Sequence, residues 1–262
     1  MPEHPPALIE FRNVSIMRGE RLALRDVSLR IDPAEHVAIL GPNGCGKSTF
    51  IKAITRECYP LARPHASLRI LGQERWNVFE LRGLLGIITN DLVAACMHES
   101  SALEIVLSGF FSSVRLMPYH RFDTSMVEAA MDALRTMEVD RLASRSMTEM
   151  SAGEVHRVVT ARALVHRPRA LLLDEPCTSL DLRAQRDVRR IFRNLAQSGL
   201  GLILVTHDLA DIIPEIGRGI LLRNGRIEAD GSKSEVLTAE RLGALFGIPV
   251  ELLERDGHYH LV

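Results

Sequence analysis

One segment of the chain has the residue types and spacing needed to bind a triphosphate. The sequence Gly41-Pro42-Asn43-Gly44-Cys45-Gly46-Lys47-Ser48 follows the apolar run 37–40 and precedes a helix-compatible stretch. Glycines let backbone N–H groups approach phosphates closely, and the positive end of the following helix faces the same anion. Lys47 can reach the β- and γ-phosphates, and Ser48 can ligate Mg²⁺. The predicted nucleotide contacts here are Gly41, Asn43, Gly44, Cys45, Gly46, Lys47, Ser48 and Thr49.

Two neighbouring acids follow a second apolar run. Asp174 and Glu175 come directly after residues 170–173, which read as a buried strand. Their carboxylates would lie at the carboxyl edge of that strand. Asp174 could hold the Mg²⁺ shell, and Glu175 could accept a proton from the attacking water or orient it. The alternative is that the acid pair only caps the end of the strand.

Two further positions are candidates for contact with the γ-phosphate. Ser151, with Glu154 three residues later, has the pattern of a capping box at the start of a helix. A serine hydroxyl and free N–H groups at a helix start also form an anion site, so the two interpretations are compatible. His207 follows the apolar run 202–205. It could hydrogen-bond the γ-phosphate, or it could be an ordinary packed or solvated histidine.

The overall composition is that of an ordinary globular protein. The chain has 262 residues, 46% of them hydrophobic and 25% charged, with a formal net charge of −1. This charge gives no signal for nucleic acid. The four cysteines lack metal or disulfide spacing, which favours reduced thiols in the cytosol. Residues 1–6 are polar and proline-rich, unlike a signal peptide, and no apolar run approaches the roughly 20 residues of a membrane span.

The hydrophobic pattern predicts alternating strands and helices. Strands are expected at residues 8–14, 23–31, 37–40, 68–71, 85–89, 170–173, 202–205, 220–222 and 226–228. Helices are expected at 48–54, 102–111, 124–137, 153–165, 182–196, 233–237 and 239–246. Asn224-Gly225 is typical of a hairpin turn. The expected fold is therefore α/β: a phosphate-loop core of mostly parallel sheet, a small antiparallel β subdomain, and a helical insert at about 91–165.

These motifs, in this order, resemble the ATP-binding cassette (ABC) ATPase family over nearly the whole chain. Residues 41–48 resemble its Walker A motif and 171–175 its Walker B motif with the catalytic glutamate. Residues 151–154 are similar to the family signature, 179–181 to the D-loop, and His207 to the switch histidine. The resemblance implies a single ATPase domain over 1–262, with a C-terminal hairpin and helices at about 219–262.

The resemblance also implies a mechanism. Two cassettes pair head to tail, and the Walker A motif of each faces the signature of the other. Ser151 and the Gly153 N–H would then contact the γ-phosphate bound to the second subunit, while Lys47, Glu175 and His207 serve catalysis. Positioning and charge neutralisation would carry most of the rate enhancement. Hydrolysis would remove the bridging phosphate and release the dimer.

The chain departs from the family pattern at several positions. The usual glutamine near the end of the strand at 85–89 is replaced, and Asn90 aligns with it as a weaker candidate for the Mg²⁺ shell. The usual adenine-stacking aromatic is missing from the first turn. Arg18 could stack its guanidinium on the base, or it could be a solvated turn residue. Weaker discrimination between ATP and GTP would follow. Ala152 and Glu154 replace a glycine and a glutamine of the signature.

Two functional classes remain open at this stage. The first is the ATPase subunit of a transporter, cytoplasmic and held at the inner face of the membrane by a separate permease. The C-terminal part of the chain, 225–250, resembles importer cassettes for metal chelates and the related soluble molybdate-type group. The latter likeness points to the second class, a soluble cassette ATPase that acts as a clamp or regulator. A sensor without turnover is disfavoured by the presence of Lys47, Asp174, Glu175 and His207, and a kinase would not need the signature. The transported solute is not predicted, because its recognition lies in partners.

Overall fold

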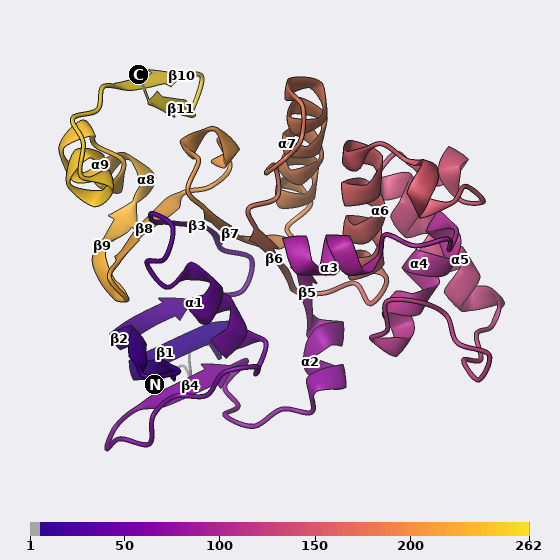
Figure 1. Ribbon diagram of the computed structural model, residues 1–262, viewed down its shortest axis with the longest axis horizontal. Coiled ribbons are helices and arrows are strands. Elements are labelled where there is room, and N and C mark those ends of the chain that lie inside the picture. The colour runs from indigo at the N-terminus through magenta and orange to yellow at the C-terminus, as the bar shows by residue number, and fades with distance from the viewer. Residues whose placement is uncertain (1–5, 262) are drawn as a thin grey trace. The chain divides into compact units, whose positions relative to one another are not determined.

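A computed structural model describes residues 6–261, which fold as two compact units (Figure 1). Among these residues, unit 1 combines 6–78 with 201–261, and unit 2 comprises 79–200. The segment judged unlike a signal peptide, 1–6, lies outside the described residues apart from Pro6. The predicted single ATPase domain over 1–262 stays a prediction.

Unit 1 contains a small antiparallel sheet with strand order β2-β1-β4. The strands are β1 (Ile9–Arg18), β2 (Arg21–Ile31) and β4 (Ser67–Ile70). The inner face of β1 packs on helix α1 (Lys47–Ile54), where the rings of Phe11 and Phe50 stack with centroids 4.8 Å apart. This aromatic contact fixes α1, and hence the loop before it, on the sheet.

A second group of strands in unit 1 is mostly parallel, with the order β7-β3-β8-β9. Strand β3 (His36–Leu40) pairs in parallel with β7 (Gly201–Thr206) and β8 (Arg218–Arg223). Strand β9 (Arg226–Ser232) returns antiparallel to β8. After His36, the core strand β3 is apolar and buried from Val37 to Leu40, as expected for a parallel strand covered on both faces. The carboxyl end of β3 leads directly into the glycine-rich loop.

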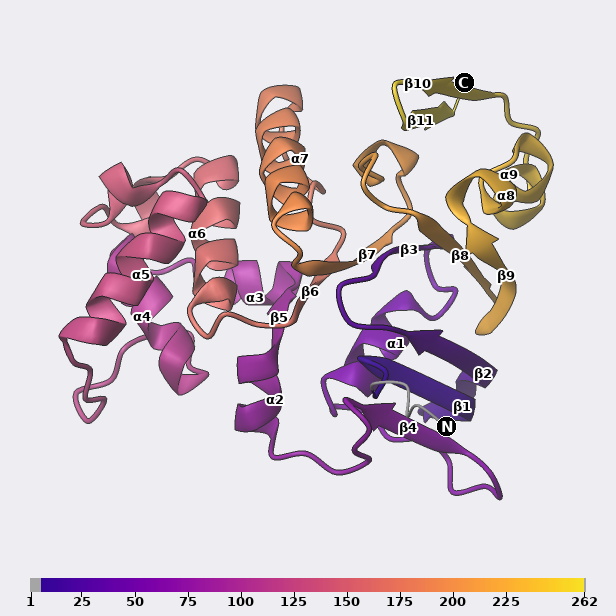
Figure 2. The same cartoon turned by 180° about the vertical axis from the view of Figure 1, so that it is seen from behind.

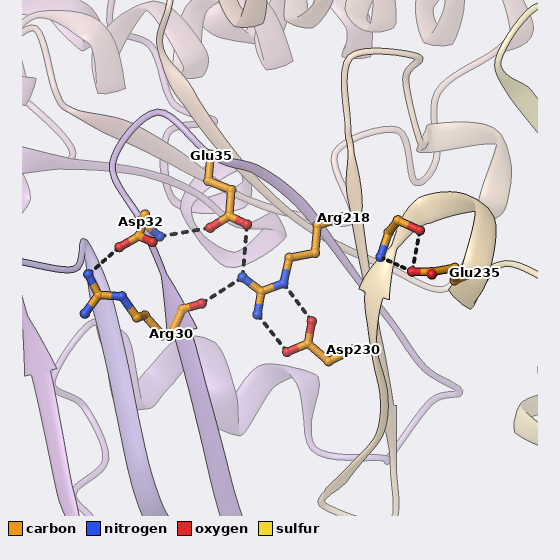
Figure 3. A network of polar contacts seen from close by, with 7 residues as sticks. Arg30, Asp32, Glu35, Arg218, Asp230 and Glu235 are labelled. Carbon is orange, nitrogen blue, oxygen red and sulfur yellow. Dashed lines mark hydrogen bonds and ion pairs between the residues drawn. The ribbon is translucent and has the colours of Figure 1, made fainter. Parts of the chain in front are cut away.

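One arginine ties the edge of this group to strand β2. Arg218 donates to both carboxylate oxygens of Asp230 at 2.6 and 2.7 Å, to Glu35 Oε1 at 3.0 Å, and to the carbonyl of Arg30 at 2.8 Å (Figure 3). The Asp230 carboxylate raises the pKa of Arg218 because it stabilises the charged guanidinium. Glu35 also accepts from the Asp32 amide at 2.9 Å. The network therefore fixes the connection from β2 to β3.

The elements of the C-terminal part of unit 1 are the 3₁₀ turn η4 (Leu209–Asp211), α8 (Lys233–Val236), α9 (Ala239–Phe246), β10 (Leu252–Arg255) and β11 (His258–Leu261). Helix α8 packs on β8 and β9, and β11 contacts the turn η4 (Figure 2). Lys233 donates to the carbonyls of Pro214 and Gly257, at 3.1 and 3.4 Å, and its ammonium lies over the ring of Tyr259. These contacts attach the terminal hairpin β10–β11 to the rest of the unit.

Unit 2 combines a parallel strand pair with helices. Strand β5 (Leu85–Ile88) pairs with β6 (Ala170–Asp174). The helices are α2 (Val78–Leu84), α3 (Asn90–Ala95), α4 (Ala102–Ser108), α5 (Thr124–Thr136), α6 (Ala152–Leu164) and α7 (Leu182–Gln197), with 3₁₀ turns η1 (Gly109–Phe111), η2 (Asp140–Leu142) and η3 (Met147–Glu149). Both ribbon views show α4, α5 and α6 packed side by side.

The predicted fold class is confirmed: mostly parallel strands, a small antiparallel sheet and a helical segment between β5 and β6. Most predicted elements lie within one or two residues of their observed bounds. The helix predicted at 102–111 ends at Ser108 and continues as the 3₁₀ turn η1. Thr89, predicted as a strand residue, is instead the N-cap of α3. Helices α2 and α3 and the hairpin β10–β11 were not predicted from the sequence.

Candidate nucleotide-binding site

The phosphate loop of unit 1 has a backbone that only glycine tolerates at its closest contacts. Gly46 has φ of 119°, and a Cβ there would lie 2.8 Å from the carbonyl oxygen of Ala23. Gly44 has φ of 78°. A Cβ on Gly41 would overlap the carbonyl oxygen of Leu222. The loop is therefore wrapped tightly against β2 and β8, and its glycines are required by geometry.

Lys47 and Ser48 begin helix α1 at the end of this loop. The N-cap is Gly46, which has no side chain to cap the first-turn N–H groups, so these donors suit an anion. Lys47 is 6% exposed, and its ammonium donates to the carbonyls of Gly41 at 2.7 Å and Pro42 at 3.3 Å. The ammonium thus lies across the loop, while the Ser48 side chain is exposed.

Cys45 contributes to the loop by packing rather than by its side-chain chemistry. Its thiol is 3% exposed, and the Cys45 amide donates to the Pro42 carbonyl at 3.2 Å. Burial raises the pKa of the thiol because it disfavours the thiolate. The Cys45 carbonyl accepts from the Gly225 amide at 2.8 Å. The nucleotide contact predicted for Cys45 can therefore come only from its backbone.

Arg18 ends strand β1 and borders an open hollow of about 550 Å³. Its Nη1 donates to Cys58 Sγ at 3.2 Å. The same hollow is lined by Tyr59, whose side chain is 68% exposed. Tyr59 was not among the predicted site residues, although an exposed aromatic side chain beside Arg18 could also stack on a base. The base-stacking role of Arg18 stays a prediction.

His207 is exposed at the carboxyl end of β7. The turn that carries it is fixed on both sides by hydrogen bonds. The Asp208 amide donates to Thr206 Oγ1 at 3.0 Å, and the Asp208 carboxylate accepts from the Ala210 amide at 2.9 Å. Thr206 Oγ1 also donates to the buried Asp211 at 3.2 Å. A histidine on such a turn is well placed for a contact that needs a defined direction.

In unit 2, the two candidate carboxylates follow the fully buried strand β6. Leu171, Leu172 and Leu173 are at most 1% exposed, so the change to two acids is abrupt. Glu175 has φ of 49°, a left-handed conformation that is unfavourable for a residue with a Cβ. Its carbonyl accepts from the Thr178 amide at 3.1 Å. No sequence pattern predicts this conformation of Glu175.

The predicted capping box at the start of α6 is confirmed. Ser151 is the N-cap, and its hydroxyl accepts from the Glu154 amide while Glu154 accepts from Ser151. Gly153 is buried, and a Cβ there would lie 2.7 Å from the Cβ of Ala184 at the start of α7. Glycine at this position therefore allows close approach of the two helix starts. Ser151 and Gly153 border a hollow of about 270 Å³.

Asn90, proposed in place of the usual glutamine, is the first residue of α3 and is exposed. The Thr89 side chain accepts from the Leu92 amide at 3.1 Å and so caps the helix. Between Thr89 and Asn90, it is therefore the Asn90 side chain that takes no part in the cap. Its place in the Mg²⁺ shell stays a prediction.

The sequence-predicted residues are divided between the two units. Unit 1 carries the phosphate loop with Lys47 and Ser48, as well as Arg18 and His207. Unit 2 carries the remainder: Asn90, Ser151, Gly153, Asp174 and Glu175. Each group is organised by short, specific contacts within its own unit.

The sequence model of the ABC transporter family matches residues 24–178 of this chain. The chain belongs to the ABC transporter family. The cassette is also 32% identical to the hemin import ATP-binding protein HmuV of Rhodococcus jostii over 256 residues, which cover 97% of this chain and 85% of that protein. Members of this family bind and hydrolyse ATP, and the present cassette is an ATPase of this type.

Solved cassettes have the same fold. A metal-chelate type ABC transporter in an inward-facing conformation aligns with a TM-score of 0.78 at 22% identity, covering 98% of both chains. The dimeric, post-hydrolysis structure of the cassette MJ0796 bound to ADP and Pi aligns with a TM-score of 0.69 at 26% identity, covering 86% of this chain and 98% of that one. Within residues 6–261, none of the helices has both the length and the hydropathy of a membrane-spanning segment.

Proposed function

We propose that this cassette powers import through a separate membrane permease, at whose cytoplasmic face two copies hydrolyse ATP. The observation that carries the proposal is the 32% identity with a hemin import ATP-binding protein over nearly the full chain. The alternative of a soluble cassette without a permease is not favoured by this relationship. Hemin, a metal chelate, is the first candidate for the solute.

In the proposed cycle, the phosphate loop of one copy and the signature helix of the other hold the same ATP. Lys47 and the first-turn N–H groups of α1 would bind the β- and γ-phosphates of this ATP. Ser151 and the Gly153 N–H of the partner copy would close on the γ-phosphate. Two local features support this arrangement: α1 has no side-chain cap, and Gly153 leaves room for Ala184 at the start of α7.

Hydrolysis itself would depend on Glu175 and His207. Glu175 would take a proton from the attacking water or orient it, and His207 would hydrogen-bond the γ-phosphate. The hydrogen-bonded turn after His207 supports a defined direction for its side chain. Loss of the γ-phosphate would then remove the contact that joins the two copies.

Mg²⁺ suits the side-chain donors that are predicted to bind it. The ion takes oxygen ligands and is commonly held by one or two protein groups together with substrate phosphates. The exposed hydroxyl of Ser48 and the carboxylate of Asp174 are oxygen donors of this kind, with Asn90 as a third candidate. Bound Mg²⁺ would neutralise the charge that develops on the phosphates.

The experiment that tests this function begins with purification of the tagged cassette from membranes. The integral membrane protein that copurifies is identified and reconstituted with the cassette in lipid vesicles. We expect ATP-dependent uptake of hemin, and we expect this uptake to disappear when Glu175→Gln replaces the parent.

Metal-free protoporphyrin and free ferric iron are the comparison solutes. If the vesicles take up neither hemin nor a comparison solute while ATPase activity is intact, hemin is excluded as the solute. A cassette that hydrolyses ATP but never copurifies with an integral membrane protein would contradict the transport role.

A further inference from the structure

The signature serine, Ser151, is hydrogen-bonded to a carboxylate of its own helix. Glu154 Oε2 accepts from the Ser151 amide at 3.0 Å and from the Ser151 hydroxyl at 2.9 Å. The Glu154 amide donates to Ser151 Oγ at 3.4 Å. The Glu154 side chain is only 16% exposed. Because a serine hydroxyl has a single hydrogen, the Ser151 hydroxyl cannot donate to Glu154 and to a phosphate at the same time.

An arginine from a neighbouring turn reaches the same carboxylate. Arg141, in the 3₁₀ turn η2, donates to Glu154 Oε1 at 3.3 Å, and its own side chain is 66% exposed. The hydrogen bonds from Ser151 lower the pKa of Glu154, with a smaller contribution from the charge of Arg141. Glu154 is therefore an anion at neutral pH, and Arg141 is the cation in contact with it.

The hollow in front of Ser151 has a mixed charged lining. Its ionisable residues are three arginines and three carboxylates: Arg141, Arg157, Arg183, Glu154, Asp181 and Asp187. Asp181 is engaged in capping α7, where it accepts from the Ala184 amide at 2.8 Å. Glu154 is the carboxylate of this group that binds Ser151, so it is the one placed to oppose an incoming phosphate.

We propose that Glu154 is a positioning residue. By accepting hydrogen bonds from the amide and hydroxyl of Ser151, it keeps this serine from binding phosphate and so sets the ATP concentration at which two cassettes pair. This inference rests on the proposed function, in which Ser151 closes on the γ-phosphate of the partner copy. Pairing requires the Ser151 hydroxyl to rotate away from Glu154. It also brings two anions, the Glu154 carboxylate and the γ-phosphate, close to the start of the same helix. Arg141 reduces this repulsion by neutralising Glu154.

Two other helices of the chain carry the same capping box and separate this role from simple capping. Ser101 and Glu104 form it at α4, where Glu104 Oε2 accepts from the Ser101 amide and hydroxyl at 2.8 and 2.9 Å. Ser232 and Glu235 form it at α8. Glutamine serves in this box as glutamate does, so Glu→Gln retains the cap while it removes the charge.

The test measures ATP-driven dimerisation by light scattering in a Glu175→Gln background, where hydrolysis does not dissolve the dimer. Adding Glu154→Gln should lower the half-saturating ATP concentration roughly three- to tenfold, because one repulsive charge near the phosphate is removed. Arg141→Gln should raise it by a similar factor. The matched controls are Glu104→Gln and Arg135→Gln, which should leave it unchanged. Binding of a fluorescent ATP analogue to the monomer should be equal in all variants.

The outcomes separate this proposal from the proposed function. If the Glu175→Gln parent dimerises but Glu154→Gln leaves its half-saturation within twofold, or raises it, the role of Glu154 is overturned while the pairing of cassettes stands. If the parent binds the ATP analogue but never dimerises, the proposed function and this inference both fail. An equal shift in Glu104→Gln would show a general effect of charge and would also overturn the role of Glu154.

Discussion

The amide of Gly225 donates a hydrogen bond to the carbonyl of Cys45 at 2.8 Å. This bond joins the turn between β8 and β9 to the middle of the phosphate loop. The Gly225 carbonyl accepts in turn from the Arg25 amide on β2, also at 2.8 Å. The hairpin turn therefore holds the phosphate loop and β2 together, although it is almost 180 residues away in sequence from the loop.

Gly225→Ala should weaken both the fold and nucleotide binding. Gly225 has φ of 77°, and a Cβ there would lie 2.5 Å from the Ala23 carbonyl oxygen, so the turn must move. We expect a loss of roughly 2 kcal/mol or more in the free energy of unfolding, and a weaker affinity for ATP, measured by denaturant titration and fluorescent nucleotide binding.

Gly247→Ala is the matched control for this substitution. Gly247 has a similar φ of 75°, but a Cβ there would meet nothing within 4 Å. It should cost about 1 kcal/mol of stability and leave ATP affinity unchanged. Equal ATP affinity of Gly225→Ala and the parent would show that the turn does not support the phosphate loop.

Much of this site could be predicted from local sequence patterns. Asn224-Gly225 predicts the hairpin, Ser151 with Glu154 predicts the capping box, and the glycines of the phosphate loop predict its tight backbone. Each depends on residues close together in the chain, where conformational preference and hydrogen bonding are decided locally. The bond from Gly225 to Cys45 depends on tertiary packing and has no such local pattern.

The features that were missed have specific physical reasons. Helix α3 was missed because Thr89 directly follows an apolar strand and fits a strand itself. In the structure, its side chain caps the helix instead. The hairpin β10–β11 was missed because its outer face is exposed and only Tyr259 is buried at 4% exposure. The left-handed φ of Glu175 is imposed by the surrounding fold, since glutamate has no intrinsic preference for it.

Gly153→Ala should destabilise the cassette by crowding the start of α7. The added methyl group would lie 2.7 Å from the Cβ of Ala184, and overpacking of this kind costs roughly 1–3 kcal/mol. Ala184→Gly in the same chain should restore part of the loss, so a double-mutant cycle measured by thermal unfolding should give a coupling of about 1 kcal/mol. Strict additivity of the two changes would contradict the contact.

His156 should make the cassette less stable in mild acid. It is 4% exposed, neither ring nitrogen has a hydrogen-bond partner among residues 6–261, and burial lowers its pKa from 6.5 to about 4. Between these pH values the unfolded chain binds a proton that the native His156 does not. The free energy of unfolding should therefore fall as pH decreases from about 6.5 to about 4, by about 3 kcal/mol.

His156→Leu should remove this part of the pH dependence and leave a flatter profile of unfolding free energy over the same range. The same substitution at the exposed His260 of β11 is the control. A pH profile of His156→Leu that runs parallel to that of the parent would mean that His156 is not the responsible group.

Arg18→Ala should lower ATP affinity severalfold if the guanidinium stacks on the base, because a cation over an exposed ring contributes about 0.5–1 kcal/mol. Tyr59→Ala, in the same hollow, tests the other candidate for this role. Affinities for ATP and GTP should be compared in each variant by competition with a fluorescent nucleotide. An unchanged affinity in Arg18→Ala would place Arg18 outside the nucleotide site.

In the proposed dimer, one ATP is held between the phosphate loop of one copy and the signature serine of another. A mixture of two variants in the Glu175→Gln background tests this arrangement. Lys47→Ala disables the phosphate loop, and Ser151→Asp retains a good N-cap while it repels phosphate. Each variant alone should remain monomeric with ATP, and an equimolar mixture should form a dimer with one complete site. A mixture that stays monomeric while the Glu175→Gln parent dimerises would contradict this arrangement, as would a Lys47→Ala variant that dimerises alone.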